Sequence, residues 1–291
     1  MTSNRKKVLA YGLLTVLIWA SAFPLTKIAQ EQFSSYSLGF LRCGIAALFL
    51  LLIGKIRHIR LPKKRDVPLF ILSGALGFGI YLIAFNTGIQ TLTSATSSIV
   101  IAVTPILTAI AAVRLYNERL SPIGWAAIFS AFAGVLLLLL WDGIFSINVG
   151  LLWTLGAAVS FCGYNLINRK LSSMGYNALE IVTYSMLCGA LLLGLWSVRG
   201  INELFAANHK QIAAIVYLGA FPSAAAYFFW GEAMSYAERI SEVTNFNFVT
   251  PLLSAVMGFL LLKEVPNAGT FIGGAAIIAS IIVFNKKGKV S

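Results

Sequence analysis

The sequence predicts an all-α integral membrane protein, with ten transmembrane helices in two inverted five-helix repeats and both termini in the cytoplasm. Three observations support this fold class: an apolar composition, a series of long apolar runs and an internal duplication. Of the 291 residues, 58% are hydrophobic and only 11% are charged, and the mean hydropathy is +0.84. Soluble domains carry roughly 25% charged residues. The composition therefore excludes an ordinary soluble domain.

Ten apolar runs approach the roughly 20 residues that a transmembrane helix needs. In chain order they cover residues 8–28, 36–54, 68–86, 94–115, 122–141, 149–168, 178–198, 211–231, 242–262 and 267–285. The connecting segments are too short to form a second domain, so one membrane domain is expected. The first run has the basic start and the Ala20-Ser21-Ala22 sequence of a signal peptide. Because it continues to Ile28 and matches residues 150–166, we interpret it as the first helix.

The duplication is visible as matching residues at fixed shifts. Thr104-Pro105 and Glu118 recur as Thr250-Pro251 and Glu264, at a shift of 146. At a shift of 138, residues 12–14 match residues 150–152, and Phe23 matches Phe161. The predicted repeats are residues 1–145 and 146–291. Because five helices are an odd number, the second repeat is expected to enter the membrane from the opposite side, as in carriers with alternating access.

Positive charge is distributed unevenly between the two sides of the predicted membrane. Most of the 22 lysines and arginines lie in the loops that face the same side as the amino terminus, whereas the opposite loops contain only Arg199, Lys210 and Lys263. Basic residues favour the cytoplasmic side, so we expect a multi-pass protein of the cytoplasmic (plasma or inner) membrane. The net charge of +12 is then explained by insertion and by anionic lipid at the cytoplasmic face. A nucleic-acid partner is not expected.

Several motifs together resemble the EamA-type branch of the drug/metabolite transporter superfamily. They are the segment Trp19 to Lys27, the tripeptide Phe40-Leu41-Arg42, the run from Thr104 to Gly134 and its second copy from Thr250 to Glu264. The resemblance covers essentially the whole chain. It implies a secondary transporter of small polar or amphipathic metabolites, such as amino acids or nucleosides, that works mostly as an exporter. A facilitative carrier or an importer of the same solutes is the main alternative.

Two other functional classes have less support in the sequence. A membrane-embedded enzyme would need a nucleophile, a metal site or a phosphate loop, and no HExxH, GxSxG, Walker or CxxC motif occurs. No enzyme activity, cofactor or metal is therefore expected. A sensory protein would need a soluble output domain through which to signal, and none is expected here; a purely structural role would not explain the polar stripes within the helices. Substrate, coupling ion and the choice between monomer and homodimer have no signature in the sequence.

Polar and aromatic side chains inside the spans are candidates for a solute cavity, because such side chains rarely face lipid without a reason. Helical spacing and position select Trp19, Tyr81, Ser97, Thr104, Tyr164, Tyr227, Trp230 and Asn245. The aromatic members would suit an amphipathic solute. The alternatives are interhelical hydrogen bonds, core packing and the interfacial aromatic belt. The cavity is expected among the first, third, fourth, sixth, eighth and ninth spans.

Charged residues within or beside the spans are candidates for proton coupling or for attracting solute. They are Lys27, Arg42, Glu232 and Glu242. Glu232 is expected near the outer end of its span, level with Lys27 and Arg42. There it could exchange protons near neutral pH or form a fixed ion pair; Glu242 is the second choice for proton coupling. Lys27 and Arg42 could attract a carboxylate or reach the headgroups, and a structural role is favoured for Arg42.

Two prolines and two glutamates complete the landmarks. Pro105 and Pro251 fall midway along the fourth and ninth spans, where proline bends a helix, so both are predicted hinges. Glu118 and Glu264 follow the ends of the same spans. They are expected to form caps or local ion pairs, for Glu118 with a nearby arginine.

Overall fold

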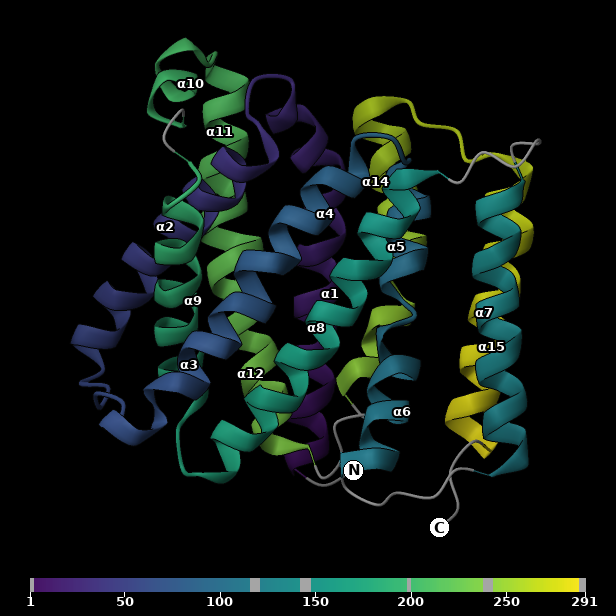
Figure 1. Ribbon diagram of the computed structural model, residues 1–291, viewed down its shortest axis with the longest axis horizontal. Helices are drawn as coiled ribbons and strands as arrows, with labels where there is room; N and C mark the ends of the chain where they lie inside the picture. The colour runs from purple at the N-terminus through teal and green to yellow at the C-terminus, as the bar shows by residue number, and fades with distance from the viewer. Residues whose placement is uncertain (1–2, 116–120, 142–147, 198–199, 238–242, 288–291) are drawn as a thin grey trace.

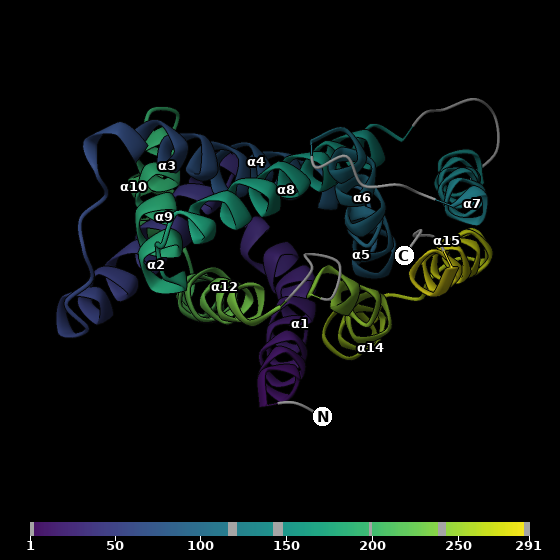
Figure 2. The ribbon, with the colours of Figure 1, turned by 90° about the horizontal axis from the view of Figure 1, so that it is seen from below.

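The protein is an all-helical bundle in its described regions (Figures 1 and 2). The computed structural model describes residues 3–115, 121–141, 148–197, 200–237 and 243–287. The helices that come first in the chain are α1 (Ser3–Gln30), α2 (Ser35–Ile56), α3 (Val67–Gly74), α4 (Tyr81–Ile89), α5 (Ser94–Ile101), α6 (Thr104–Leu115) and α7 (Pro122–Leu140). The later helices are α8 (Val149–Ser173), α9 (Ala178–Gly194), α10 (Gly200–Ala206), α11 (His209–Leu218), α12 (Ala226–Tyr236), α14 (Thr250–Leu262) and α15 (Ala268–Lys287).

Among the residues that the structure describes, six helical stretches are long and apolar enough to cross a membrane. They are Asn4–Gln30, Ser35–Ile56, Lys64–Ile89, Ser94–Leu115, Val149–Ser173 and His209–Tyr236. Shorter apolar helices occupy Pro122–Gly134, Ala178–Gly194, Thr250–Leu262 and Ala268–Phe284. All of these stretches overlap the apolar runs of the sequence. The all-helical class and the multi-pass character are confirmed, whereas ten crossings in two inverted repeats remain a prediction.

Helix starts are determined by polar side chains that accept hydrogen bonds from the first free backbone N–H groups. Such N-caps are Ser34, Ser121, Asn148, Asn177 and Asn208. In α9 the cap is reciprocal, because Glu180 Oε2 also accepts from the backbone N–H of Asn177 at 2.9 Å. This is a capping box.

Two of the long stretches contain a π-helical segment. The segment η2 (Ala75–Ile80) lies between α3 and α4, and η3 (Gly219–Ala225) lies between α11 and α12. A π-helix leaves some backbone carbonyls outside the regular hydrogen-bond ladder, and such segments occur frequently at functional sites. The two segments fall at corresponding positions of the predicted repeats.

Helical geometry is also interrupted before each Thr-Pro pair. The first interruption separates α5 from α6, which begins at Thr104, and the second lies in the 3-10 segment η4 (Asn245–Phe248) before α14, which begins at Thr250. Pro105 and Pro251 are thus each the second residue of a helix rather than midway along one. In the first turn a missing N–H breaks no hydrogen bond. The irregularity therefore precedes each proline, although Pro105 lies near the middle of the whole stretch Ser94–Leu115. Hinges at Pro105 and Pro251 remain a prediction.

Two helices pack as a pair at one edge of the bundle. Figures 1 and 2 show α7 and α15 side by side, away from the centre, and they contact each other extensively. A Cβ on Gly134 would lie 3.0 Å from the Gly273 carbonyl oxygen and 2.7 Å from Ile277 Cγ1, so glycine permits this close approach. The largest buried cluster lies elsewhere, around Phe78, Phe161 and Trp230.

Candidate functional site

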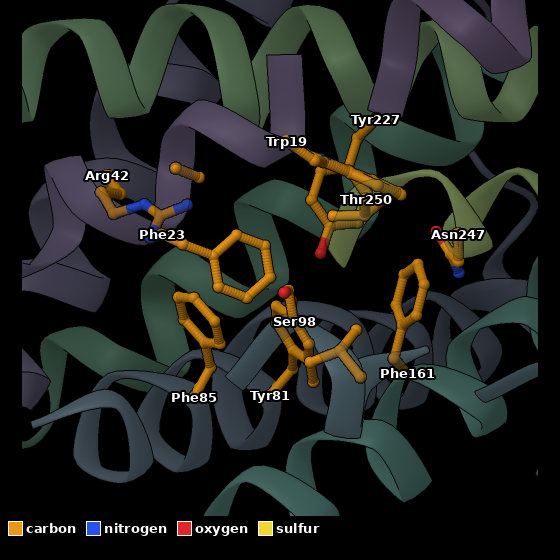
Figure 3. Close-up of a pocket in the computed structure, with 12 residues that line it drawn as sticks. Trp19, Phe23, Arg42, Tyr81, Phe85, Ser98, Phe161, Tyr227, Asn247 and Thr250 are labelled. Carbon is orange, nitrogen blue, oxygen red and sulfur yellow. The ribbon is translucent and has the colours of Figure 1, made fainter. Parts of the chain in front are cut away.

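A pocket lies at the centre of the bundle, beside α1 (Figure 3). Helix α1 contacts elements from both halves of the sequence, among them α5, α12 and α14. Its residues Trp19, Ala22 and Phe23 face the pocket, as expected for positions three and four residues apart on a helix. The remaining lining residues are Arg42, Tyr81, Phe85, Ser98, Ile101, Phe161, Tyr227, Asn247 and Thr250.

The pocket is narrow in this conformation. The volume open to the centre of a water molecule is about 30 Å³, which holds about two water molecules. Aromatic rings occupy most of the remaining space: Trp19 lies 5.2 Å from Tyr227 and 5.5 Å from Phe161, measured between ring centroids. Both pairs are edge-to-face, the arrangement that aromatic quadrupoles favour. A solute larger than a few atoms requires these rings to separate.

Two of the rings are anchored by carbonyl groups of the π-helical segments. Trp19 Nε1 donates to the Pro222 carbonyl oxygen in η3 at 3.0 Å, and the Tyr227 hydroxyl donates to the Gly77 carbonyl oxygen in η2 at 3.2 Å. Each bond crosses from one predicted repeat to the other. The irregular segments therefore determine where the central rings lie, and a change in either segment would move a pocket wall.

Arg42 brings a buried positive charge to the pocket wall. Only 3% of the residue is exposed. Its Nε donates to Ser223 Oγ and its Nη1 donates to Thr26 Oγ1, both at 3.3 Å. Within the described residues the ion pairs join other side chains, and no carboxylate lies within salt-bridge distance of Arg42.

Two further polar groups in the lining lack a partner. Asn247 Nδ2 and Thr250 Oγ1 are buried without a hydrogen bond to any described group. Both residues belong to the interrupted region that precedes and begins α14. Buried polar atoms are normally satisfied, so unpaired atoms that line a pocket mark positions for a polar ligand or water.

Lys27 lies outside the pocket and makes an ion pair that joins the two halves. Its Nζ contacts Glu264 Oε1 and also donates to the Leu92 carbonyl oxygen at 2.8 Å. Glu264 Oε2 accepts from the backbone N–H of Ser94, in the first turn of α5, at 2.8 Å. The predicted local role of Glu264 was therefore wrong, because its partner is 237 residues away in the chain. Glu118 lies outside the described residues.

Of the predicted cavity residues, Trp19, Tyr81 and Tyr227 line the pocket, and so does the charged candidate Arg42. Four others are buried behind its wall. Thr104 Oγ1 donates to the Ile101 carbonyl, and Trp230 Nε1 donates to Asn165 Oδ1. Tyr164 packs against Tyr227, and Ser97 Oγ has no described partner.

The predicted position of Glu232 was wrong. The stretch His209–Tyr236 runs antiparallel to α1, because the Tyr217 hydroxyl lies 2.9 Å from Ser21 Oγ and the Tyr236 ring stacks on Tyr11. The carboxyl end of this stretch, with Glu232, therefore lies toward Lys7, whose Nζ is 4.3 Å from the Tyr236 ring centroid. It is not level with Lys27, near the end of α1, or with Arg42, which bonds to Thr26. Glu242 lies outside the described residues, as does the side chain of Asn245.

Sequence reasoning did not select several lining residues. Phe23 and Phe161 occupy matching positions at the shift of 138, and both face the pocket. That match was a usable signal for them. Ser98 lines the pocket, whereas its neighbour Ser97 was predicted to do so. Asn247 likewise lines the pocket, whereas the prediction was Asn245. Asn247 lies in the 3-10 segment η4, where helical spacing does not apply, whereas Ser98 lies within the regular helix α5 and the spacing selected the wrong face there.

Comparison with known proteins identifies the class. The model of the EamA-like transporter family matches residues 6–140 and, a second time, residues 148–286. The chain belongs to the EamA-like transporter family. It is therefore a multi-pass membrane transporter and not an enzyme.

Individual relatives span nearly the full length of this EamA-like protein. A protein named as a probable terminal-alkyne amino-acid exporter of Streptantibioticus cattleyicolor is 28% identical over 94% of this chain and 92% of its own. The uncharacterized transporter YdfC of Bacillus subtilis is 28% identical over 97% of this chain and 92% of its own. A solved crystal structure covers 96% of both chains with a TM-score of 0.69 at 20% identity, which supports the fold alone.

Proposed function

We propose that this EamA-like protein is a secondary carrier that exports a small amphipathic metabolite across the cytoplasmic membrane by alternating access. The observation that carries the proposal is the central pocket, whose walls come from both halves of the chain and whose rings are held by the irregular segments η2 and η3. Carriers bind solute where their repeats meet, beside discontinuous helices.

Paired irregularities support the inverted-repeat part of the proposal. In the described residues of each half, a π-helical segment is followed by an interruption just before a Thr-Pro pair. The family model also matches each half separately. Exchanging the conformations of two such halves would open the pocket first to one side of the membrane and then to the other.

Contacts near both ends of α1 support a closed pocket in this conformation. Near the carboxyl end, Lys27 and Glu264 tie α1 to the segment after α14. Near the amino end, the ring of Tyr11 stacks on Phe229 and on Tyr236 of α12, at centroid distances of 5.9 and 6.3 Å. Transport requires these two sets of contacts to break in turn.

Two indirect observations support export as the direction of transport and the cytoplasmic membrane as the location. The relative from Streptantibioticus cattleyicolor is named as an amino-acid exporter. The basic residues of the chain cluster in the segments that the positive-inside rule assigns to the cytoplasm. Amino-acid-like solutes are therefore the first group to test.

The direct test is solute counterflow in liposomes that contain the purified protein. Labelled amino acids, nucleosides and amines are measured with and without a pH gradient, for the wild type and for Glu232→Gln. Saturable counterflow of at least one solute supports a carrier. Accumulation that follows the gradient and disappears in Glu232→Gln would support proton coupling through Glu232, whereas equal exchange in both proteins would favour a facilitator. No counterflow of any solute would contradict the proposal.

A further inference from the structure

Arg42 is a buried cation in a membrane-spanning helix whose described partners are neutral. It lies within α2, only 3% exposed, and its two hydrogen bonds go to hydroxyl groups. A charge placed inside a membrane is costly and is normally paired or turned toward water. Removing such a charge from water costs several kcal/mol that hydroxyl groups do not fully offset. The pocket therefore offers a positive charge that an anion could neutralise.

The guanidinium has donors left for an anion. It carries five N–H groups, of which the bonds to Ser223 and Thr26 use two. Arg42 lines the pocket, and Figure 3 shows its nitrogens directed toward the rings of the pocket. Planar guanidinium and carboxylate groups match each other in two parallel hydrogen bonds. A carboxylate is the small anion that this geometry suits.

The other lining residues indicate the chemistry of the rest of such a ligand. Figure 3 shows Arg42 at one side and Asn247 at the other, with aromatic rings between them. The middle of the pocket is apolar, formed by rings such as Phe85, Tyr81 and Phe161. On the side away from Arg42, Asn247 Nδ2 is a donor without a partner, and Thr250 Oγ1 is likewise unpaired.

We propose that Arg42 is the anion-binding residue of the carrier and that the transported solute has a carboxylate, an apolar body and a second hydrogen-bonding group. The carboxylate binds Arg42, the apolar body lies among the rings, and the second group contacts Asn247 and Thr250. This inference rests on the proposed carrier function, because it names the solute of the same pocket. It reverses the structural role that the sequence favoured for Arg42.

The test compares matched solutes that differ only in the carboxylate. Binding of L-phenylalanine, L-phenylalaninamide and phenethylamine, and of L-leucine, L-leucinamide and isopentylamine, is measured by thermal unfolding of the purified protein. The variants are Arg42→Gln, Arg42→Lys and, as a matched control, Arg57→Gln at the exposed end of α2. Counterflow of the same six solutes is measured separately in liposomes.

We expect at least one acid to stabilise the wild type and Arg57→Gln, and its amide and amine to have little effect. Losing a charge-assisted pair should raise the Kd for the acid about 10- to 100-fold in Arg42→Gln. Arg42→Lys, which keeps the charge without the planar fork, should bind with intermediate strength and provides the readout if Arg42→Gln does not fold.

Three results would overturn the inference: amides or amines that bind as well as the acids, variants at position 42 that bind the acid as the wild type does, or no response to any acid. Failure of the carrier proposal can be distinguished from failure of the proposed role of Arg42. Carboxylate-specific binding without counterflow would contradict transport alone, and counterflow of an amine without binding of its acid would contradict the role of Arg42 alone.

Discussion

At the residue scale, the rings that line the pocket differ in their contacts from the rings that are buried behind its wall. Trp19 contacts Tyr227, Phe161 and Trp230 and also donates a hydrogen bond to η3. Trp230, although fully buried, donates to Asn165 and does not face the pocket. Transport should therefore depend on Trp19 through both its ring and its N–H group.

Substitutions at Trp19 separate these two contributions. Trp19→Phe keeps a ring and loses one hydrogen bond of about 1 kcal/mol, so counterflow should fall about fivefold. Trp19→Ala also loses the ring contacts, each of about 0.5–1.5 kcal/mol, and should reduce counterflow by more than tenfold. Trp153→Ala, at an exposed position of α8, is the control. Equal counterflow in Trp19→Ala and in the control would show that the ring is not part of the path.

The Lys27–Glu264 pair makes a second prediction at this scale. The side chains are 26% and 13% exposed, so their coupling should be about 1–2 kcal/mol, between the values for exposed and buried pairs. Thermal unfolding of Lys27→Met, Glu264→Gln and the double variant measures it as a double-mutant cycle. The double variant should be destabilised less than the two single effects together. Strict additivity would mean that the two groups do not interact.

At the element scale, the positions of the helices were predictable and their irregularities were not. Apolar runs gave the spans because the membrane requires about 20 apolar residues per crossing. The π-helical segments depend on tertiary contacts, such as those of Gly77 with Tyr164, that no local pattern encodes. Asn247 was missed because it lies in the 3-10 segment η4, where helical spacing does not apply. Glu232 was misplaced because its stretch runs antiparallel to α1, so that its carboxyl end lies toward the start of α1.

Gly77 allows a direct test of η2. A Cβ at this position would lie 2.3 Å from Tyr164 Cδ2, whereas a Cβ at Gly156 would meet nothing within 4 Å. Gly77→Ala must displace a buried ring and should cost about 1–3 kcal/mol. It should also reduce counterflow, because the Gly77 carbonyl anchors Tyr227. Gly156→Ala should leave counterflow unchanged and should not lower the unfolding midpoint, because alanine favours a helix more than glycine does. A Gly77→Ala protein indistinguishable from Gly156→Ala would refute the role of η2.

The start of α9 is connected to the loop before α3. Glu180 accepts hydrogen bonds from the backbone and side chain of Arg60 and closes the capping box with Asn177. The bonds to Glu180 hold the pKa of the Arg60 guanidinium above its usual value. Glu180→Gln should therefore lower the midpoint of thermal unfolding. Arg65→Gln removes a 3.5 Å contact with the adjacent residue Asp66 and should not lower the midpoint. Equal midpoints in the two variants would contradict a stabilising role of Glu180 at the start of α9.

At the scale of the whole molecule, helices from the first and second parts of the chain line one pocket, and contacts near both ends of α1 enclose it. The sequence indicated the duplication. Three of the cavity candidates selected from it, Trp19, Tyr81 and Tyr227, line the pocket. The sequence did not predict which groups surround each charged side chain. Arg42 reaches the pocket and Lys27 pairs across the halves only because of tertiary packing.

The measurement that tests alternating access most directly is counterflow of a protein whose halves are tied together at one end. Lys27 and Glu264 are both replaced by cysteine in a background from which Cys43, Cys162 and Cys188 have been removed. The two thiols are then joined by a short, reducible bifunctional reagent. Counterflow of an accepted solute should stop when the link forms and return when it is reduced, while each single-cysteine variant stays active. Undiminished counterflow with the link intact would contradict the account.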